Sequence, residues 1–481
     1  MTQFDNYING EWVKGVDYRD NVNPSDTSDV IGKFAQADAA QTQAAIDAAK
    51  KAFETWSMSG IQQRSDLLDN VSNAIIARKA ELGDLLAREE GKTLAEGIGE
   101  VVRAAQIFKF FAGEALRIPG ERLASVRPGI NVELTREPIG VIGMITPWNF
   151  PIAIPAWKIA PALAYGNTVV IKPAELAPAC TWQITKMLAD AGVPAGVFNL
   201  VMGPGRKVGN TIVESPDVKA ISFTGSVETG AMIRSKAVER GAKVQLEMGG
   251  KNPQVVLDDA DLDTAVNCAL QSGFFSTGQR CTAASRIIVT EGIHDAFVDA
   301  LTKKLQAIKV GDARTEGTQI GPLADEGQLN KSLEYIGIGV KEGAKLACGG
   351  ENLKAVDGKE GYYLSPALLT GCKNTMRVCQ EEIFGPVAAV IKVKDYEEAL
   401  AVANDTEFGL SSGIATTSLK YAEDYKRRAR AGMVMVNLPT AGVDYHVPFG
   451  GTKGSSFGSR EQGRYAVEFY TTVKTSYINA G

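Results

Sequence analysis

Between residues 140 and 250 the sequence alternates continuously apolar runs with helical stretches, and this rhythm limits the possible folds more than any other feature. Strands of roughly five to seven residues without polar alternation are buried on both faces of a sheet. Helices between such strands make the sheet parallel and doubly wound, with ligands bound beyond the carboxyl ends of the strands. The apolar runs are residues 140–146, 168–172, 197–203, 219–225 and 244–250.

A second α/β domain is predicted after the paired glycines Gly249 and Gly250, because strand-like and helical segments alternate again. Upstream, residues 40–118 are predicted to be helical, since apolar residues recur there at helical spacing. The tail, residues 467–478, alternates like an edge strand that could pair with another element or another subunit. The second set of strand-like segments is residues 252–258, 285–290, 385–393, 412–417 and 432–437.

Composition argues against several function classes. A net charge of −5 disfavours a sequence-independent nucleic-acid binder, which needs a basic face to displace counterions from phosphates. No stretch approaches the ~18–20 apolar residues that span a bilayer, and the N-terminus lacks the pattern of a secretory signal. Six scattered cysteines without CxxC pairs favour reduced thiols and a cytoplasmic location. With only two histidines in the chain, neither a His-rich metal site nor a Cys–His nucleophile pair is expected.

Four segments resemble the aldehyde dehydrogenase superfamily, and three shorter motifs support them. The four are PWNFP (147–151), LEMGGKNP (246–253), FFSTGQRCT (274–282) and EEIFGPV (381–387). The shorter motifs are KPAE (172–175), FTGS (223–226) and PFGG (448–451). Any one of them is weak evidence, but seven in order and at family-like spacing are hard to obtain by chance.

The resemblance implies a fold class and a division of the chain. The expected fold is α/β, with a Rossmann-like doubly wound cofactor domain, a second α/β catalytic domain and a small β element for oligomerisation. Members of the family are usually homodimers or homotetramers. The three parts correspond to residues 1–119 with 140–249, residues 250–450, and residues 120–139 with 465–481.

The family motifs also imply three catalytic roles. Cys281 matches the nucleophile, whose thiolate attacks an aldehyde and, after hydride loss, is left as a thioester. Asn149 matches the residue whose amide, with the backbone N–H of the nucleophile, stabilises the oxyanion. Glu247 matches the general base that activates water to hydrolyse the thioester. The branch of the family that transfers the acyl group to coenzyme A lacks this glutamate, so a free acid is the expected product.

The cofactor implied by the resemblance is NAD, with NADP as an alternative. Ser226 and the following helix start would bind the diphosphate, and Lys172 with Glu175 the adenine ribose. Glu175 favours NAD, because a carboxylate repels a 2′-phosphate. Glu382 matches the residue that holds the nicotinamide ribose. The full predicted set is Ile145, Thr146, Pro147, Trp148, Lys172, Glu175, Gly205, Gly209, Phe223, Thr224, Gly225, Ser226, Gly249, Glu382 and Phe384.

Two further residues match family positions. Lys158 matches a lysine near the cofactor ribose, and Glu461 matches a carboxylate near the path of the hydrolytic water. A plain salt bridge is a nearly equal interpretation of both residues.

The substrate is less clearly encoded. Arg280 precedes the nucleophile, where a cation could bind a distal carboxylate or phosphate, and Arg103 is a weaker second candidate. Residues 438–451 and 460–475 resemble the α-ketoglutaric semialdehyde branch of the family. Succinate, glutarate and phosphorylated triose aldehydes would suit the same arginine, and aromatic aldehydes remain an alternative. Other predicted tunnel residues are Phe150, Trp157 and Thr282, with Phe274, Tyr445 and His446 as aromatic candidates.

Three competing hypotheses come from other classes. An acylating enzyme is disfavoured by Glu247, and a catalytically silent binding member of the fold is disfavoured because Cys281, Glu247 and Asn149 are all present. A reductase with Tyr–Lys or His–Asp chemistry is disfavoured by the scarcity of histidine and the lack of a suitably placed YxxxK.

Overall fold

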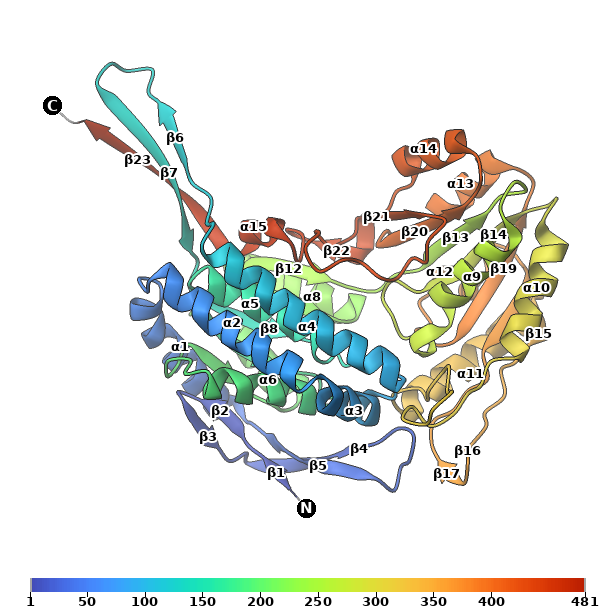
Figure 1. The fold of residues 1–481 in the computed structure, drawn as a ribbon, viewed down its shortest axis with the longest axis horizontal. Coiled ribbons are helices and arrows are strands. Elements are labelled where there is room, and N and C mark those ends of the chain that lie inside the picture. Colours follow the sequence, from blue (N-terminus) through green and yellow to red (C-terminus); the bar gives the residue numbers. More distant parts are fainter. Residues whose placement is uncertain (1, 480–481) are drawn as a thin grey trace.

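The computed structural model describes residues 2–479, which form two large sheets and a projecting three-stranded sheet (Figure 1). The first large sheet has eight strands in the order β22-β12-β11-β8-β9-β10-β2-β3. Its five central strands run parallel, and the predicted apolar runs form them. The strands are β2 (Asn6–Ile8), β3 (Glu11–Val13), β8 (Val141–Ile145), β9 (Thr168–Lys172), β10 (Phe198–Leu200), β11 (Val218–Thr224), β12 (Lys243–Glu247) and β22 (Ser456–Phe457).

Helices cover this sheet, and the predicted helical region 40–118 forms four of them. Helix α1 begins after Asp38, whose side chain accepts a hydrogen bond from the Gln41 N–H. Helix α4 begins with a capping box between Thr93 and Glu96. The helices are α1 (Ala39–Trp56), α2 (Ile61–Ala77), α3 (Lys79–Glu90), α4 (Leu94–Ala115), α5 (Ala153–Ala164), α6 (Ala179–Asp190), α7 (Asn210–Glu214) and α8 (Val227–Glu239).

The second large sheet has seven strands in the order β15-β18-β19-β14-β13-β20-β21, all parallel except the edge strand β15. The predicted segments after residue 250 form five of them. The strands are β13 (Asn252–Val256), β14 (Ala284–Thr290), β15 (Lys345–Cys348), β18 (Ala367–Cys372), β19 (Val387–Val393), β20 (Ser411–Ala415) and β21 (Met433–Val436). Its helices are α9 (Leu262–Gly273), α10 (His294–Gln306), α11 (Glu326–Lys341), α12 (Arg377–Gln380), α13 (Tyr396–Asn404) and α14 (Leu419–Arg428).

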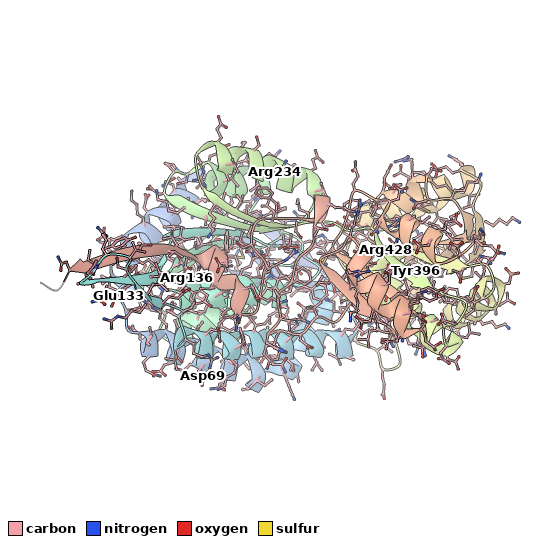
Figure 2. The ribbon with its side chains drawn as sticks, turned by 90° about the horizontal axis from the view of Figure 1, so that it is seen from above. Asp69, Glu133, Arg136, Arg234, Tyr396 and Arg428 are labelled. Atoms are coloured by element: carbon pink, nitrogen blue, oxygen red, sulfur yellow. The ribbon has the colours of Figure 1, made fainter. Side chains whose placement is uncertain are left out.

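The third sheet projects from the body of the molecule and joins distant parts of the chain (Figure 1). The tail strand β23 (Thr471–Asn479) pairs antiparallel along its whole length with β7 (Ile130–Pro138), which also pairs with β6 (Glu121–Ala124). Figure 2 shows Glu133 and Arg136 along this projection, at the end of the molecule opposite to Tyr396 and Arg428. The predicted strand is therefore confirmed from Thr471 onward, whereas the first four residues of the predicted segment form the short helix α15 (Val467–Tyr470) instead.

Smaller strands complete the fold. A three-stranded sheet near the N-terminus contains β1 (Gln3–Phe4), β4 (Asp17–Val22) and β5 (Val30–Gln36). A hairpin contains β16 (Ala355–Val356) and β17 (Lys359–Glu360), and a short helix, α15 (Val467–Tyr470), leads into β23. Among residues 2–479, no helix is both long enough and apolar enough to cross a membrane.

Candidate active site

Two cavities meet at Cys281. Cavity A has a volume of about 260 Å³, and its lining combines Cys281 with charged residues of α4 and the aromatic residues Phe150, Trp157 and Phe449. Cavity B has a volume of about 180 Å³, and its lining combines loops after the parallel strands of the first sheet with residues of α11 and of the segment after α12. A cysteine on both linings can reach one molecule in each cavity, so chemistry between two bound molecules can occur there.

The backbone before Cys281 adopts an unusual conformation. Ser276, Thr277 and Gly278 have φ angles of 51°, 55° and 66°. A Cβ atom on Gly278 would lie 2.2 Å from the carbonyl oxygen of Gly385, so only glycine fits. Left-handed residues outside glycine are costly and concentrate at functional sites. This tight turn places Cys281 at the junction of the two cavities.

The environment of Cys281 opposes ionisation. Burial, and then the charges of Glu247 and Glu382, raise the pKa of the Cys281 thiol to about 12. The carbonyl oxygen of Cys281 accepts a hydrogen bond from Asn252 Nδ2 at 2.7 Å. Because the thiolate is the nucleophilic form, a thiol in this setting needs a base before it can attack.

Asn149 lies in the loop after β8, against the segment that leads to the cysteine. Its Nδ2 donates a hydrogen bond of 2.9 Å to the carbonyl oxygen of Gln279, two residues before Cys281. Lys92 Nζ donates to the backbone carbonyl of Asn149 at 2.8 Å and lies 3.8 Å from the centre of the Phe150 ring. An amide nitrogen carries two hydrogens, so Asn149 keeps a second donor for a ligand.

Glu247 is the last residue of β12 and is almost completely buried. Burial raises the pKa of its carboxyl group well above the usual value, and the hydrogen bond from Ser456 opposes that rise. The charge of Glu247 also raises the pKa of Cys281. The predicted base and nucleophile are therefore electrostatically coupled, as the proposed chemistry requires.

Lys158 and Glu461 form a buried ion pair beside Glu247. Lys158 Nζ donates to Glu461 Oε1 and, at 2.7 Å, to Ser222 Oγ. The structure thus supports the salt-bridge interpretation of Lys158, and its Nζ is engaged here rather than with a ribose. The reason is that Glu461, distant in sequence, provides the opposite charge that a buried lysine needs.

Cavity B contains eight of the predicted cofactor residues. A Cβ on Gly249 would lie 2.2 Å from Glu382 Oε2, so the glycine makes room for this carboxylate, which accepts a bond from the Gly250 N–H. Ser226 caps helix α8, whose N-terminus attracts anions, and the hydroxyl of Thr224 is buried without a hydrogen-bond partner. These features fit a dinucleotide. The eight are Pro147, Trp148, Thr224, Gly225, Ser226, Gly249, Glu382 and Phe384.

The other seven predicted cofactor residues are not on the lining of cavity B. Burial lowers the pKa of Lys172 to about 8, and Lys172 lies next to Gly209. Glu175 accepts a hydrogen bond from the Gly205 N–H and forms an ion pair of 3.0 Å with Arg19 of β4. The group is Ile145, Thr146, Lys172, Glu175, Gly205, Gly209 and Phe223; Phe223 packs beneath Gly225.

Cavity A contains all five predicted substrate residues: Arg103, Phe150, Trp157, Arg280 and Thr282. Phe274 does not approach the cavity as expected, because its side chain is completely buried in the core beside the second sheet. Tyr445 packs its ring on Phe110, 6.2 Å away, while the nearby lining of cavity A comes from Ala441, Gly442 and Val443. The tunnel is therefore less aromatic than the sequence suggested.

The charges on the lining of cavity A do not cancel. Lys92 pairs with Glu100 at 2.7 Å, and Arg280 lies 3.5 Å from Glu96. Arg103 donates only a 3.3 Å hydrogen bond to Gln462, and no carboxylate within salt-bridge distance of it exists in the described chain. Three cations and two carboxylates on the lining leave Arg103 without an ion-pair partner there, and the charges of Glu100 and Asp444 act on it only at longer range. The Nε atoms of Arg103 and Arg280 are buried and have no hydrogen-bond partner in the described part of the chain.

Several site residues were missed from the sequence. They are Lys92, Glu96 and Glu100 in cavity A, Met248, Gln328 and Lys331 in cavity B, and Ser456 beside Glu247. The dense charges of EEGKTLAEGIGE in a region predicted to be helical were the available signal for the first three. Across residues 2–479, no group of three or more His, Cys, Asp or Glu side chains is arranged to hold a metal ion.

Comparisons with known proteins agree with this geometry. The model of the aldehyde dehydrogenase family matches residues 12–476. The α-ketoglutaric semialdehyde dehydrogenase of Bacillus subtilis is 44% identical over 98% of this chain and 97% of its own length. The α-ketoglutarate semialdehyde dehydrogenase of Haloferax volcanii is 42% identical, covering 98% of each chain. The crystal structure of Staphylococcus aureus betaine aldehyde dehydrogenase with NAD⁺ superposes with a TM-score of 0.96, at 35% identity over 99% of this chain and 95% of that one. The chain belongs to the aldehyde dehydrogenase family.

Proposed function

We propose that this aldehyde dehydrogenase oxidises a short anionic semialdehyde to the free acid with NAD, and that α-ketoglutaric semialdehyde is its substrate. The observation that carries the proposal is the positive charge of Arg103, which forms no ion pair within the described residues, in the cavity that ends at Cys281. A monoanionic substrate would neutralise this charge. The names of the relatives from Bacillus subtilis and Haloferax volcanii support the same substrate.

The reaction begins with the Cys281 thiol, which must lose its proton. Glu247 is the base, since its charge is coupled to the thiol and its raised pKa makes it a good proton acceptor when it is ionised. The thiolate attacks the aldehyde carbon and forms a thiohemiacetal. The amide of Asn149 and the backbone N–H of Cys281 stabilise its oxygen anion, a contribution of about 3–4 kcal/mol for each such donor.

When the thiohemiacetal collapses, its carbon loses a hydride and becomes the carbonyl carbon of a thioester on Cys281. NAD, held by the residues of cavity B, would supply the acceptor for this hydride. Glu247 first releases to solvent the proton that it took from the thiol. Water then attacks the thioester, the ionised Glu247 takes the proton of the water, and the carbon–sulfur bond breaks, so that the Cys281 thiolate leaves as the acid is released. Water and the Glu247 carboxylate suffice for hydrolysis of the thioester, so coenzyme A is not required.

The cofactor assignment depends on two groups of residues. Glu382, Gly249 and the N-terminus of α8 would hold the nicotinamide half and the diphosphate. Glu175 and Lys172 would hold the adenine ribose, and the carboxylate of Glu175 favours the 2′-hydroxyl of NAD over a phosphate. The ion pair of Glu175 with Arg19 reduces that repulsion, so use of NADP as a second cofactor stays part of the proposal.

The charges of cavity A favour some candidate aldehydes over others but do not distinguish between all of them. Succinate and glutarate semialdehydes carry the same single carboxylate at a similar distance from the aldehyde. A phosphorylated triose carries more negative charge than the single excess cation balances. An aromatic aldehyde would leave Arg103 without a counter-charge in a half-buried setting, which costs binding energy.

The three sheets correspond to three parts of the chain with different proposed roles. We assign NAD binding to residues 1–119 and 140–249, catalysis to residues 250–450, and oligomerisation to residues 120–139 and 465–481. The projecting sheet supports a dimer or tetramer, because strand β23 exposes Val473, Tyr477 and Ile478. All six cysteines are free thiols in the described chain, which supports a cytoplasmic location.

The test is NADH formation by the purified enzyme with a panel of aldehydes, each with NAD or NADP and with or without coenzyme A. The panel is α-ketoglutaric, succinate and glutarate semialdehydes, benzaldehyde and a phosphorylated triose. We expect the highest kcat/KM for α-ketoglutaric semialdehyde with NAD and no stimulation by coenzyme A. A higher kcat/KM for benzaldehyde would contradict the substrate proposal, and an acyl-CoA product would contradict the role of Glu247.

A further inference from the structure

Ser456 lies directly opposite Glu247 in the antiparallel pair of β12 and β22. Its hydroxyl donates a short hydrogen bond to Glu247 Oε2, and its Oγ accepts one from the Gly451 N–H at 2.7 Å. Because the N–H occupies an acceptor site of the oxygen, the hydroxyl hydrogen is directed at the carboxylate. Ser456 is thus a donor of fixed direction to one oxygen of the base.

The other oxygen of Glu247 is confined as well. Gly450 has a φ of 148°, and a Cβ atom on it would approach Glu247 Oε1 to 2.8 Å. The carboxyl group therefore lies between a serine that binds one oxygen and a glycine that leaves room for the other. Both residues belong to the segment after β21, whereas Glu247 ends β12, so tertiary packing alone brings them together.

The charges around Glu247 come from several elements. Lys158 of α5 attracts its negative charge but is already bonded to Glu461 and Ser222. Glu461 repels it, Arg460 attracts it, and Cys281 faces it from the catalytic loop. Attractive and repulsive charges thus act on Glu247 from several elements, and the hydrogen bond from Ser456 is the direct contact that orients its carboxylate.

We infer that Ser456 is a positioning residue: its hydrogen bond favours the ionised form of Glu247 and orients the carboxylate to take the proton of the water that hydrolyses the Cys281 thioester. The inference rests on the proposed function. In this step the water oxygen forms a bond to the acyl carbon, and the carbon–sulfur bond breaks. The proton of the water passes to Glu247, and the electron pair of the broken bond stays on sulfur. No electron transfer is involved.

The test measures hydrolysis directly in Ser456→Ala, Ser456→Thr and the wild type, each in its full-length form. Enzyme in excess reacts with NAD and a limiting amount of the best aldehyde of the panel. Rapid quenching and intact-mass measurement then follow the decay of the acyl-enzyme between pH 6 and 10. Ser459→Ala is the matched control, because Ser459 lies in the same segment and makes no hydrogen bond to Glu247.

Loss of the hydrogen bond should move the pH profile of acyl-enzyme decay upward by about one pH unit in Ser456→Ala, since a bond to a charged group favours the ionised form. Below the midpoint the decay rate then falls about tenfold, because the ionised fraction of Glu247 drops by that factor when its pKa rises by about one. The initial amount of NADH formed per active site should not change. Ser456→Thr, which keeps the hydroxyl, and Ser459→Ala should both retain the wild-type midpoint.

The outcomes separate this inference from the proposed function. A Ser456→Ala profile that superposes on the wild-type profile overturns the positioning role, provided that Glu247→Gln still slows decay. If Glu247→Gln hydrolyses the acyl-enzyme at the normal rate, the assigned base itself is wrong. If Ser456→Ala does not fold, Ser456→Cys replaces it, because a thiol keeps the volume and is a much weaker donor; an unchanged midpoint in that variant equally overturns the inference.

Discussion

Replacement of Arg103 by methionine should weaken the reaction with α-ketoglutaric semialdehyde far more than the reaction with a neutral aldehyde. Methionine keeps most of the length and apolar volume of arginine while it removes the charge. Arg103 lines cavity A, and within residues 2–479 its side chain hydrogen-bonds only to Gln462 while its Nε has no partner. It therefore has donors available for a substrate carboxylate.

The expected magnitude follows from the contacts. A hydrogen bond to a charged group contributes about 1.5–3 kcal/mol, and we take about 2 kcal/mol because Arg103 shares its donors with Gln462. With about 1.4 kcal/mol for each factor of ten, kcat/KM for the semialdehyde should fall about 30-fold. Benzaldehyde carries no carboxylate, so its kcat/KM should change less than about threefold.

The assay is the initial rate of NADH formation with both aldehydes, for Arg103→Met, Arg280→Met and the double variant. If both arginines bind one carboxylate, the losses of the single variants should not add in the double variant. Arg427→Met is the matched control, because this arginine of α14 is 81% exposed and loses the same charge. Equal losses for the two aldehydes in Arg103→Met would refute the reasoning, since the arginine would then act on the fold rather than on the carboxylate.

Three further predictions concern the nucleophile, the cofactor and pH. Cys281→Ser should abolish NADH formation while the Kd for NAD, measured by calorimetry, stays within about threefold of wild type; substantial turnover would contradict the assignment of the nucleophile. Gly249→Ala should raise the KM for NAD at least about tenfold, since the new methyl group would lie 2.2 Å from Glu382 Oε2 and must displace it; an unchanged KM would place the nicotinamide ribose elsewhere. The rate of the initial NADH burst should rise with pH from 6 to 9. The pKa of Cys281 is raised to about 12 and the pKa of Glu247 is also raised, so more thiolate and more ionised base form as the pH increases. A burst rate independent of pH would show that thiol ionisation does not limit attack.

Local sequence patterns predicted much of the fold. The five apolar runs between residues 140 and 250 became the parallel centre of the first sheet, since a strand buried on both faces must be apolar throughout. The family motifs likewise indicated Cys281, Asn149 and Glu247, and the structure brings each of them to the junction of the two large sheets. These features depend on short stretches of chain and could be seen without tertiary structure.

Contacts between distant residues could not be predicted in this way. Sequence position made Arg280 the stronger candidate for the substrate, but the structure places Glu96, 184 residues earlier, 3.5 Å from it. Arg103 has no such carboxylate partner, which reverses the order of the two arginines. For Lys158 the sequence left a ribose contact and a salt bridge open, and its partner Glu461 lies 303 residues later in the chain.

The sequence by itself determined the fold class and the family and predicted Cys281 as the nucleophile, because each of these follows from periodicity or from a short motif. Only the tertiary structure decided which charges are neutralised and which are left for a ligand. In cavity A, Arg280 meets Glu96 of α4, while Arg103 of α4 meets only the neutral side chain of Gln462, which follows β22, within the described residues. Nothing in the linear order of residues specifies that these side chains meet. The orientation of Glu247 by Ser456 has the same origin, since a hydrogen bond across 209 residues exists only after β12 and β22 have paired.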